Sequence, residues 1–350
     1  MRKTLKRVLT VSSGIVLIGA TLMAASVAMS KVESTPNGVH KRVLLPMGPL
    51  GSAGVVTYAG TGDSPVLAGF LDGPVVRKTQ EGWSATWFCQ DHVERRETTR
   101  VELEIDCAGR RHMFNLAPVA AQPEIFRMPG KLVVLSDIEG NAPFLDAALS
   151  RLGITGADGQ WRFGANRLVI VGDSVDRGRD VFAVLWRLHA LARQAAAAGG
   201  GVHVLLGNHE QYLLRGNPSR AHPEHRYTVE ALGGQERAFG ADTVLGQWLR
   251  AQPVIVKAGK VLFAHGGISK EVASKNLSVE ALNSAMRSYW GGQHAPATAL
   301  DAVLGNNGVT QYRGYFMDMP GAYGKASQAD VDAALRVYDG DAIVVGHTLV

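Results

Sequence analysis

The 350-residue sequence has only two cysteines, no internal repeat and no long low-complexity run. With 46% hydrophobic and 19% charged residues, it has the composition of an ordinary globular protein with enough apolar material for a buried core. Its length favours one large α/β domain with a smaller appendage.

The basic excess is concentrated at the N-terminus. Residues 1–7 contain four cations, and an apolar run follows from Val8 to about Met29, which is typical of an export signal. Removing residues 1–28 takes away four of the 36 cations and none of the 31 carboxylates, so the net charge falls from +5 to about +1. The charge therefore gives no support for a nucleic-acid partner, which would need a basic face.

Residues 1–30 are predicted to be a signal peptide or a membrane anchor. Ser26-Val27-Ala28 offers a small-x-small cleavage site, but the apolar run approaches the roughly 20 residues that span a bilayer. We expect an exported, periplasmic protein that contacts the inner membrane only through this segment, if it is uncleaved. In that compartment Cys89 and Cys107 are expected to form a disulfide, with two buried thiols as the alternative.

Changes in the hydrophobic pattern divide the rest of the chain. Residues 31–60, rich in Gly, Pro and Ser, are typical of an irregular lead-in, whereas segments 83–88 and 101–105 alternate apolar and polar residues as half-buried strands do. We therefore predict a small β-rich domain over residues 31–125. The short apolar runs and helical stretches after Pro129 predict an α/β domain over residues 126–350, with its clearest helix at 179–198.

Five apolar runs carry the functional interpretation, because a residue that can bind metal follows each of them within a residue or two. The runs cover 131–135, 167–171, 202–206, 260–264 and 342–345, and the residues after them are Asp137, Asp173, Asn208, His265 and His347. Loops at the carboxyl ends of strands converge on one edge of an α/β sheet, so these side chains should meet. A single such residue is usually a cap or a turn residue, whereas five in succession predict a metal site.

The predicted donor set suits two divalent ions. Oxygen and nitrogen donors without thiolate favour Mn, Fe or Zn over copper or an iron–sulfur cluster. Two such ions about 3.5–4 Å apart can share a carboxylate and activate a water molecule for in-line attack on phosphorus. Asp173, which is central in the order, is the natural bridging ligand.

Four ordered blocks surround these residues: GDSVDRG at 172–178, GNHE at 207–210, HGG at 265–267 and GH at 346–347. Together they resemble the signature of calcineurin-like metallophosphoesterases, in particular the phosphoprotein phosphatase branch with its bacterial Shewanella-like members, over residues 130–350. The resemblance implies an α/β fold built as a two-sheet sandwich flanked by helices. It also implies hydrolysis of phosphoric monoesters on a phosphorylated protein or a small phosphoester.

The resemblance further implies a role for each residue of the site. It implies that Asp137 binds the first metal and that Asp173 bridges the two. The second metal would be bound by Asn208, His265 and His347. His209 would protonate the leaving oxygen, and Asp176 would hold the tautomer of His209. Arg177 and Arg313 would bind the phosphate, with a surface arginine as the alternative for Arg313.

Two features depart from the family pattern. Glu139 stands where the family has the histidine of Asp-x-His-Gly; it could bind the first metal through oxygen, or leave that metal weakly held. The sequence also stops at Val350, three residues beyond His347, where relatives continue through further strands. A truncated chain and a different closure of the fold are both open.

Three functions are compatible with these residues. The leading one is a metal-dependent phosphoric monoester hydrolase of the protein-phosphatase type, and the second is a nucleotide or dinucleoside polyphosphate hydrolase. The third is a pseudophosphatase that binds a phosphorylated ligand without turnover. The presence of both His209 and Asp176 argues against the third, because a binding module needs no general acid.

Overall fold

The computed structural model describes residues 69–349 throughout, together with residues 19–21 and 24 and the backbone of residues 31–35, 38–46 and 52–57. The chain divides into two compact units, residues 1–68 and Gly69–Val350. Most of the predicted signal or anchor segment, residues 1–30, lies outside the described residues. Within the described part of the chain, no helix is long and apolar enough to cross a membrane.

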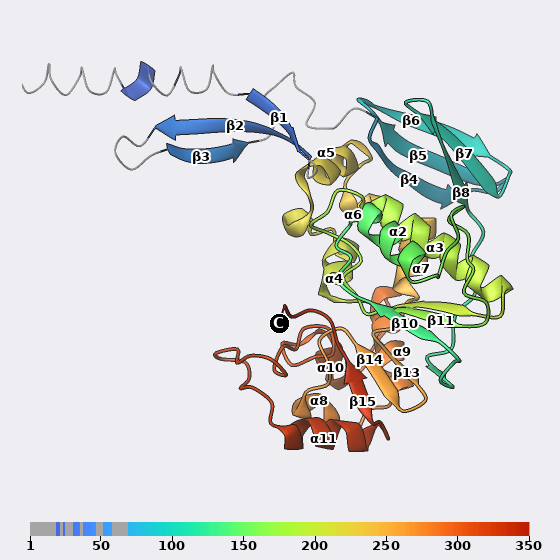
Figure 1. The fold of residues 1–350 in the computed structure, drawn as a ribbon, viewed down its shortest axis with the longest axis vertical. Coiled ribbons are helices and arrows are strands. Elements are labelled where there is room, and N and C mark those ends of the chain that lie inside the picture. The colour runs from blue at the N-terminus through green and yellow to red at the C-terminus, as the bar shows by residue number, and fades with distance from the viewer. Residues whose placement is uncertain are drawn as a thin grey trace, which may run out of the picture. The chain divides into compact units, whose positions relative to one another are not determined.

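The first unit contains an antiparallel sheet (Figure 1). Its strands, with β2 in the centre, are β1 (Lys31–Thr35), β2 (Gly38–Pro46) and β3 (Ser52–Thr57). The structure therefore differs from the irregular lead-in predicted for residues 31–60. The apolar and β-branched residues of β2, among them Val39, Val43 and Leu44, favour a strand and outweigh the Gly, Pro and Ser content of this stretch.

Five further strands begin the second unit. They form a three-stranded antiparallel sheet and a hairpin: β4 (Leu71–Lys78), β5 (Trp83–Cys89), β6 (His92–Thr98), β7 (Glu102–Cys107) and β8 (Arg110–Asn115). A disulfide joins Cys89 at the end of β5 to Cys107 at the end of β7, with 5.8 Å between their Cα atoms. The predicted disulfide is therefore confirmed, and it links the two β elements.

These strands pack directly on helices of the α/β part. β4 contacts α3 (Val181–Ala197) and α7 (Val244–Arg250), and Trp186 of α3 donates through Nε1 to the carbonyl oxygen of Pro74 at 3.0 Å. The five strands thus belong to the same compact unit as the rest of residues 69–350. The domain boundary near residue 125 stays a prediction.

Two sheets form the centre of the α/β part (Figure 1). The first is parallel and runs in the order β10 (Leu132–Leu135), β11 (Arg167–Ile170), β12 (Gly201–Val204). The second is mixed and runs in the order β15 (Ala342–Val344), β14 (Val261–Ala264), β13 (Ile255–Ala258), β9 (Ile125–Phe126). The five runs predicted from the sequence are strands β10, β11, β12, β14 and β15.

Alternation of side chains along the strands explains how the sheets stack. Val169 and Val171 pack with Val256 and Phe263 of the second sheet in one buried cluster. Their neighbours, such as Ile170, belong to a separate cluster formed with the helices. Because successive side chains of a strand point to opposite faces, each sheet is buried on both sides. This is the predicted two-sheet sandwich flanked by helices.

Helices fill the connections between the strands. The helix predicted at 179–198 is α3, whose buried face includes Val184, Leu188 and Leu191. The others before β13 are α2 (Ala142–Arg151), α4 (Asn208–Leu214), η2 (Pro218–Arg220), α5 (Pro223–Ala231), α6 (Gln235–Ala238) and α7. Between β14 and β15 lie α8 (Lys270–Ser274), α9 (Val279–Trp290), α10 (Ala297–Leu304) and α11 (Gln328–Val337).

Candidate metal centre and active site

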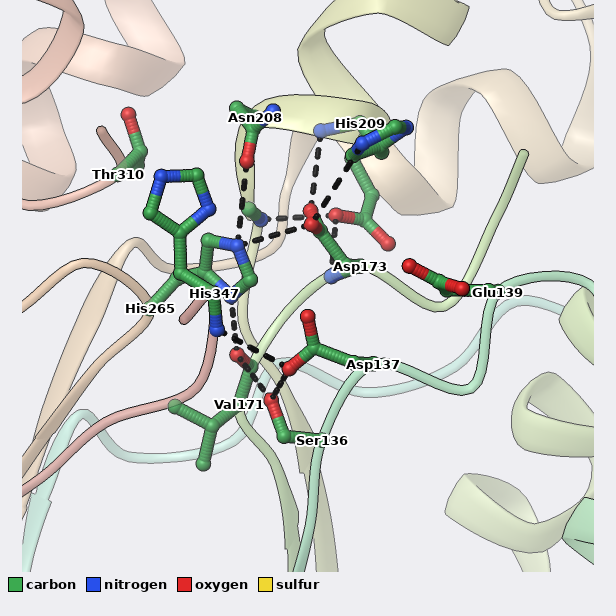
Figure 2. Close-up of polar contacts among 12 residues, drawn as sticks. Ser136, Asp137, Glu139, Val171, Asp173, Asn208, His209, His265, Thr310 and His347 are labelled. Carbon is green, nitrogen blue, oxygen red and sulfur yellow. Dashed lines mark hydrogen bonds and ion pairs between the residues drawn. The ribbon is translucent and has the colours of Figure 1, made fainter. Parts of the chain in front are cut away.

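Loops that follow five strands of the two sheets bring polar side chains together, as Figure 2 shows. The five candidate metal ligands lie in the loops after β10, β11, β12, β14 and β15. In that order they are Asp137, Asp173, Asn208, His265 and His347. The carboxyl ends of these strands meet because the strands of each sheet that carry them run parallel. The site therefore gathers residues that span 210 positions of the sequence.

His265 lies at the centre of this group. Its Nδ1–H donates to the carbonyl oxygen of Val171 at 2.7 Å, so its Nε2 faces Asp173 Oδ2 at 3.0 Å and Asn208 Oδ1 at 3.2 Å. A carbonyl oxygen can only accept, and this contact therefore fixes which ring nitrogen carries the hydrogen. An imidazole held in this way presents its second nitrogen to a metal ion or to a proton.

Burial and charge act in opposite senses on the pair Asp173 and His265. Burial would raise the pKa of Asp173 and lower that of His265, but their mutual attraction prevails and brings the pKa of Asp173 down to about 2. The same attraction raises the pKa of His265 to about 9. The oxygens of Asp173 and Asn208 thus favour a positive charge at this point, and a divalent cation would meet the same oxygens.

His347 completes a group with metal-ligand spacing. Ligand atoms of Asp173, His265 and His347 all lie within 4.8 Å of one another. His347 Nε2–H donates to the carbonyl oxygen of Gln311 at 3.1 Å, which leaves Nδ1 available. Burial, followed by the charges of His265 and Arg313, lowers the pKa of His347 to about 3. The ring is therefore neutral, as a metal ligand must be.

Asp137 and Glu139 lie on the loop after β10, beside this group and outside it. Asp137 Oδ2 accepts hydrogen bonds from Ser136 Oγ at 2.6 Å and from the backbone N–H of His347 at 3.1 Å. Asp137 therefore joins the first and the last loop of the site. Asn208 lies next to the group through its contact with His265.

Two glycines allow the loops to approach so closely. Gly172 has a φ of +84°, and a Cβ atom there would meet His265 Nδ1 at 2.7 Å and the Cα of Gly207 at 2.9 Å. A Cβ atom on Gly207 would overlap Asp173 Oδ1. Only a residue without a side chain leaves room for three loops to share one site.

The backbone of the site is unusual as well. Six site residues other than glycine adopt the left-handed conformation, with φ between 51° and 67°: Asp137, Glu139, Asp173, Asp176, Arg177 and His347. Such conformations persist only where the surrounding structure compensates their cost, and they cluster at functional sites. Hydrogen bonds between the first two loops compensate here, among them Glu139 N–H to Asp173 O at 3.0 Å.

His209 lies beside the metal group near the start of α4. Its Nδ1 is 2.9 Å from Asp176 Oδ2, and its Nε2 is 3.9 Å from Asp173 Oδ2. Because Asp176 accepts the Nδ1–H, Nε2 is the atom that can exchange a proton in the site. Burial would lower the pKa of His209, but the hydrogen bond to Asp176 and the charge of Asp173 raise it. This arrangement suits a general acid.

Arg177 and Glu139 form an ion pair at the more exposed side of the site. Arg177 Nη1 is 2.8 Å from Glu139 Oε1, and Arg177 Nη2 is 3.4 Å from His209 Nε2. The Arg177 side chain is 53% exposed. Burial raises the pKa of Glu139, whereas Arg177 acts in the opposite sense. The guanidinium can thus meet an incoming anion at the place that His209 Nε2 reaches.

Arg313 approaches the site from the segment that precedes α11. Its Nη1 donates to the carbonyl oxygen of His347, and its backbone N–H donates to Tyr323 Oη at 2.9 Å. In this structure its guanidinium therefore holds the loop that carries His347.

Glu210 is a site residue to which the sequence analysis assigned no role. Its carboxylate is fully buried and accepts the backbone N–H groups of Asp173 at 2.9 Å, Ser174 at 2.6 Å and Gly207 at 2.8 Å. Burial and the charge of Asp173 raise the pKa of Glu210 to about 7, although the three N–H donors favour its charged form. Glu210 aligns the loop after β11 with the start of α4. The available signal was an acidic residue at the third position of a helix.

Comparisons with known proteins agree with the resemblance that the four sequence blocks carry. The family model for the calcineurin-like phosphoesterases matches residues 130–350. Shewanella-like protein phosphatase 2 of Arabidopsis thaliana is 24% identical over 272 residues, which cover 64% of this chain and 67% of the relative. Shewanella-like protein phosphatase 1 of Plasmodium berghei is 26% identical over 225 residues, which cover 63% and 61%. The matches thus span about two thirds or less of these relatives' length.

A solved structure matches more of the chain. The crystal structure of a cold-active protein-tyrosine phosphatase of a psychrophilic Shewanella species has a TM-score of 0.71 and 32% sequence identity to this chain. The match covers 80% of this chain and 85% of that structure.

Proposed function

The chain belongs to the calcineurin-like phosphoesterase family, and from this membership we propose that it is a phosphatase that hydrolyses phosphorylated side chains of proteins with two divalent metal ions. The observation that carries the proposal is the position of His209. Its Nε2 lies 3.9 Å from Oδ2 of Asp173, and Asp173 belongs to the group whose ligand atoms suit a metal. Its Nδ1 bonds to Asp176. A proton donor beside a metal group is what cleavage of a phosphoester needs.

The residues of the site fit divalent ions by their chemistry. They offer carboxylate, amide and imidazole donors without thiolate, which favours Mn, Fe or Zn. In the proposed arrangement Asp137 holds the first ion, Asp173 is shared, and the second ion is held by Asn208, His265 and His347. When bound, such ions supply positive charge to the phosphate and activate a water molecule as the nucleophile. That Glu139 also binds the first ion stays a prediction; in this structure its carboxylate pairs with Arg177.

The residues of this chain perform the remaining steps. Arg177 binds the phosphate oxygens through its guanidinium, for which Glu139 is the resident partner until substrate arrives. His209 then donates its Nε2 proton to the leaving oxygen. Asp176 keeps the ring in the required tautomer and stabilises the imidazolium form. Arg313 holds the His347 loop and is proposed as the second phosphate arginine.

The exposure of Arg177 supports a protein as substrate. A phosphate-binding side chain that is 53% exposed can be reached by a phosphorylated side chain on a folded or extended protein. The matched relatives are named protein phosphatases, and the matched structure is named a protein-tyrosine phosphatase. The two other functions, nucleotide hydrolysis and binding without turnover, are outcomes of the test.

A metal and substrate titration tests the proposal. The purified chain is stripped with a chelator and reloaded with Mn²⁺, Fe²⁺ or Zn²⁺, and release of phosphate is followed on a phosphotyrosine peptide, a phosphoserine peptide and a dinucleoside polyphosphate. We expect activity to depend on added metal and kcat/KM to be higher for a phosphopeptide. A higher kcat/KM for the dinucleotide would favour the nucleotide hydrolase, and peptide binding without phosphate release would favour the pseudophosphatase.

We also propose that the protein is exported. The cations and apolar run of residues 1–30 support this, and so does the disulfide between Cys89 and Cys107, because disulfides persist outside the cytoplasm. A C-terminal fusion to a reporter that is active only in the periplasm should be active. Activity of a cytoplasm-specific reporter in the same fusion position would contradict the proposal.

A further inference from the structure

A turn formed by residues 309–311 follows α10 and contacts loops of the metal centre. The carbonyl oxygen of Val309 accepts the backbone N–H of Gly266, in the loop after β14, at 2.7 Å. The carbonyl oxygen of Gln311 accepts the Nε2–H of His347, in the loop after β15, at 3.1 Å. Two of the loops that carry candidate metal ligands are therefore attached to this turn.

The middle residue of the turn, Thr310, bonds through its side chain to a third loop. Its Oγ1 accepts a hydrogen bond from Gln211 Nε2 at 2.8 Å and donates one to the carbonyl oxygen of Val303 in α10 at 2.6 Å. Thr310 and Gln211 are at most 1% exposed, so removing either side chain leaves a buried polar group without its partner. Gln211 lies three positions after Asn208 in α4, and this spacing places both side chains on the same face of the helix.

The three candidate ligands of the second ion thus share one support. Asn208, His265 and His347 come from three different loops (Figure 2), and consecutive residues of the turn bond to α4, to the loop after β14 and to His347 itself. A binding site tolerates displacements of only about 0.5 Å in the groups that form it. The alignment of the three loops should therefore determine how tightly the second ion is held.

We propose that Thr310 is a positioning residue for the second metal ion, and that its hydroxyl group aligns Asn208 with His265 and His347 by joining α4 to the turn. The other two attachments use a backbone carbonyl of the turn, whereas this one uses a side chain and can be removed by substitution. Thr310 acts through the ligands and is assigned no contact with substrate. The inference rests on the proposed two-metal function.

Substitutions of nearly the same shape separate the hydroxyl group from the packing of the side chain. Thr310→Val replaces the hydroxyl with a methyl group and should raise the dissociation constant of one Mn²⁺ ion about 10–100-fold, the usual effect of losing a hydrogen bond behind a metal ligand. Calorimetric titration of the metal-free, full-length protein with Mn²⁺ measures this constant. The other ion should bind as in the wild-type protein. Thr310→Ser keeps the hydroxyl group and should restore the wild-type affinity.

Thr243 provides a matched control within the chain. It is 1% exposed, and its Oγ1 donates to the carbonyl oxygen of Gly240 at 2.9 Å and accepts the backbone N–H of Gly246 at 3.1 Å. Thr243→Val thus removes a buried hydroxyl group that also makes two hydrogen bonds, at the start of α7. This variant should have lower thermal stability and unchanged Mn²⁺ affinity.

The same bond can also be removed from α4. Gln211→Met should weaken binding of the same Mn²⁺ ion, and the double variant with Thr310→Val should bind it no more weakly than the weaker single variant, because both changes remove one interaction. Thermal unfolding shows whether each variant is folded. If Thr310→Val is not folded, Gln211→Met compared with Thr243→Val decides.

The outcomes separate this inference from the proposed function. A wild-type protein that binds no second Mn²⁺ ion would overturn the two-metal function, and this inference with it. Two bound ions in the wild-type protein, with unchanged affinities in Thr310→Val and Gln211→Met, would overturn this inference alone. Equal weakening by Thr310→Val and Thr243→Val would also overturn it, because loss of stability would then explain the effect.

Discussion

At the level of single residues, Asp173 Oδ2 and His209 Nε2 lie 3.9 Å apart, and the two residues are expected to have different roles. Asp173 belongs to the group with metal-ligand spacing, whereas His209 directs its Nε2 into the site, 3.4 Å from Arg177 Nη2, and bonds to Asp176 through Nδ1. His209→Ala should therefore lower kcat about 10²–10⁴-fold, the usual effect of losing a general acid, and leave the metal content intact. Asp173→Ala should remove metal as well as activity. Metal analysis of both proteins by mass spectrometry checks this, and equal metal content in the two variants would contradict the assignment.

Glu139 is the residue where the sequence departs from the family block, and its surroundings suggest a role in addition to the predicted one. Its carboxylate lies 2.8 Å from the Arg177 guanidinium and therefore competes with phosphate for that cation. Glu139→Gln keeps the shape and removes the charge, so we expect KM for a phosphomonoester to fall several-fold while the metal content stays the same. Steady-state kinetics combined with metal analysis distinguishes the outcomes. Loss of one metal equivalent would show that Glu139 is a ligand, as its position in the sequence block predicts.

At the level of elements, a buried hydrogen bond between an aspartate and a histidine joins α5 to β4. Asp72 Oδ2 of β4 lies 2.7 Å from His225 Nδ1 of α5, and both side chains are at most 1% exposed. α5 also carries Glu224, which is 3.0 Å from Arg179 next to the 172–178 block. Asp72→Asn should lower the free energy of unfolding by about 1.5–3 kcal/mol, because it replaces the charged acceptor of a buried hydrogen bond with a neutral one.

The chain contains its own control for this prediction. Asp91 and His92 form an Asp–His pair of nearly the same length, 2.8 Å, but at 79% and 60% exposure. Asp91→Asn should leave the free energy of unfolding nearly unchanged, since exposed pairs contribute little. Urea unfolding of the two variants measures both. If both variants lost a similar amount of unfolding free energy, burial would not determine how much an Asp–His pair stabilises the fold.

The elements that the sequence predicted well are those with a local signal. The strands β10, β11 and β12 are short continuous apolar runs, and the apolar face of α3 repeats at helical spacing, so each could be recognised from neighbouring residues alone. The ligand candidates followed from these strands and from the ordered blocks. The pairing of Asp72 with His225 and the bonds of Glu210 to the backbone of Asp173 and Ser174 could not be predicted, because they join residues 36 or more positions apart and depend on how elements pack.

At the level of the compact unit formed by residues 69–349, the parallel sheet of β10, β11 and β12 borders two environments, the metal centre and a separate cavity. The loops after its strands contribute Asp173 and other groups to the metal centre, while His203 within β12 and His189 on α3 line a cavity of about 900 Å³ at another place in the unit. His203 accepts a hydrogen bond from Arg167 Nη1 at 3.1 Å and stacks on Phe126 at 4.4 Å. A nitrogen that accepts from a guanidinium carries no proton, so this ring is neutral.

These two neutral histidines predict how stability depends on pH. Burial is the main cause that lowers the pKa of His189 to about 4 and that of His203 to about 3, from an ordinary value of 6.5. In the unfolded chain both rings take up protons below pH 6.5, and the folded protein cannot follow. Each histidine therefore contributes stability that is present above pH 6.5 and is lost on acidification, by about 1.4 kcal/mol per pH unit.

Comparison of variants isolates this effect from other groups. Glu210, whose pKa is raised to about 7, acts in the opposite direction between its ordinary value of 4.5 and that value, so the wild-type slope alone is a sum of opposing contributions. His203→Gln removes one titrating ring and should flatten the fall in unfolding free energy between pH 6.5 and 4.5, measured in urea with a chelator present. The exposed His294, changed to Gln, should leave the fall unchanged. If His203→Gln and His294→Gln fall in parallel with the wild-type protein, then the buried ring at His203 is not what makes the folded state sensitive to acid.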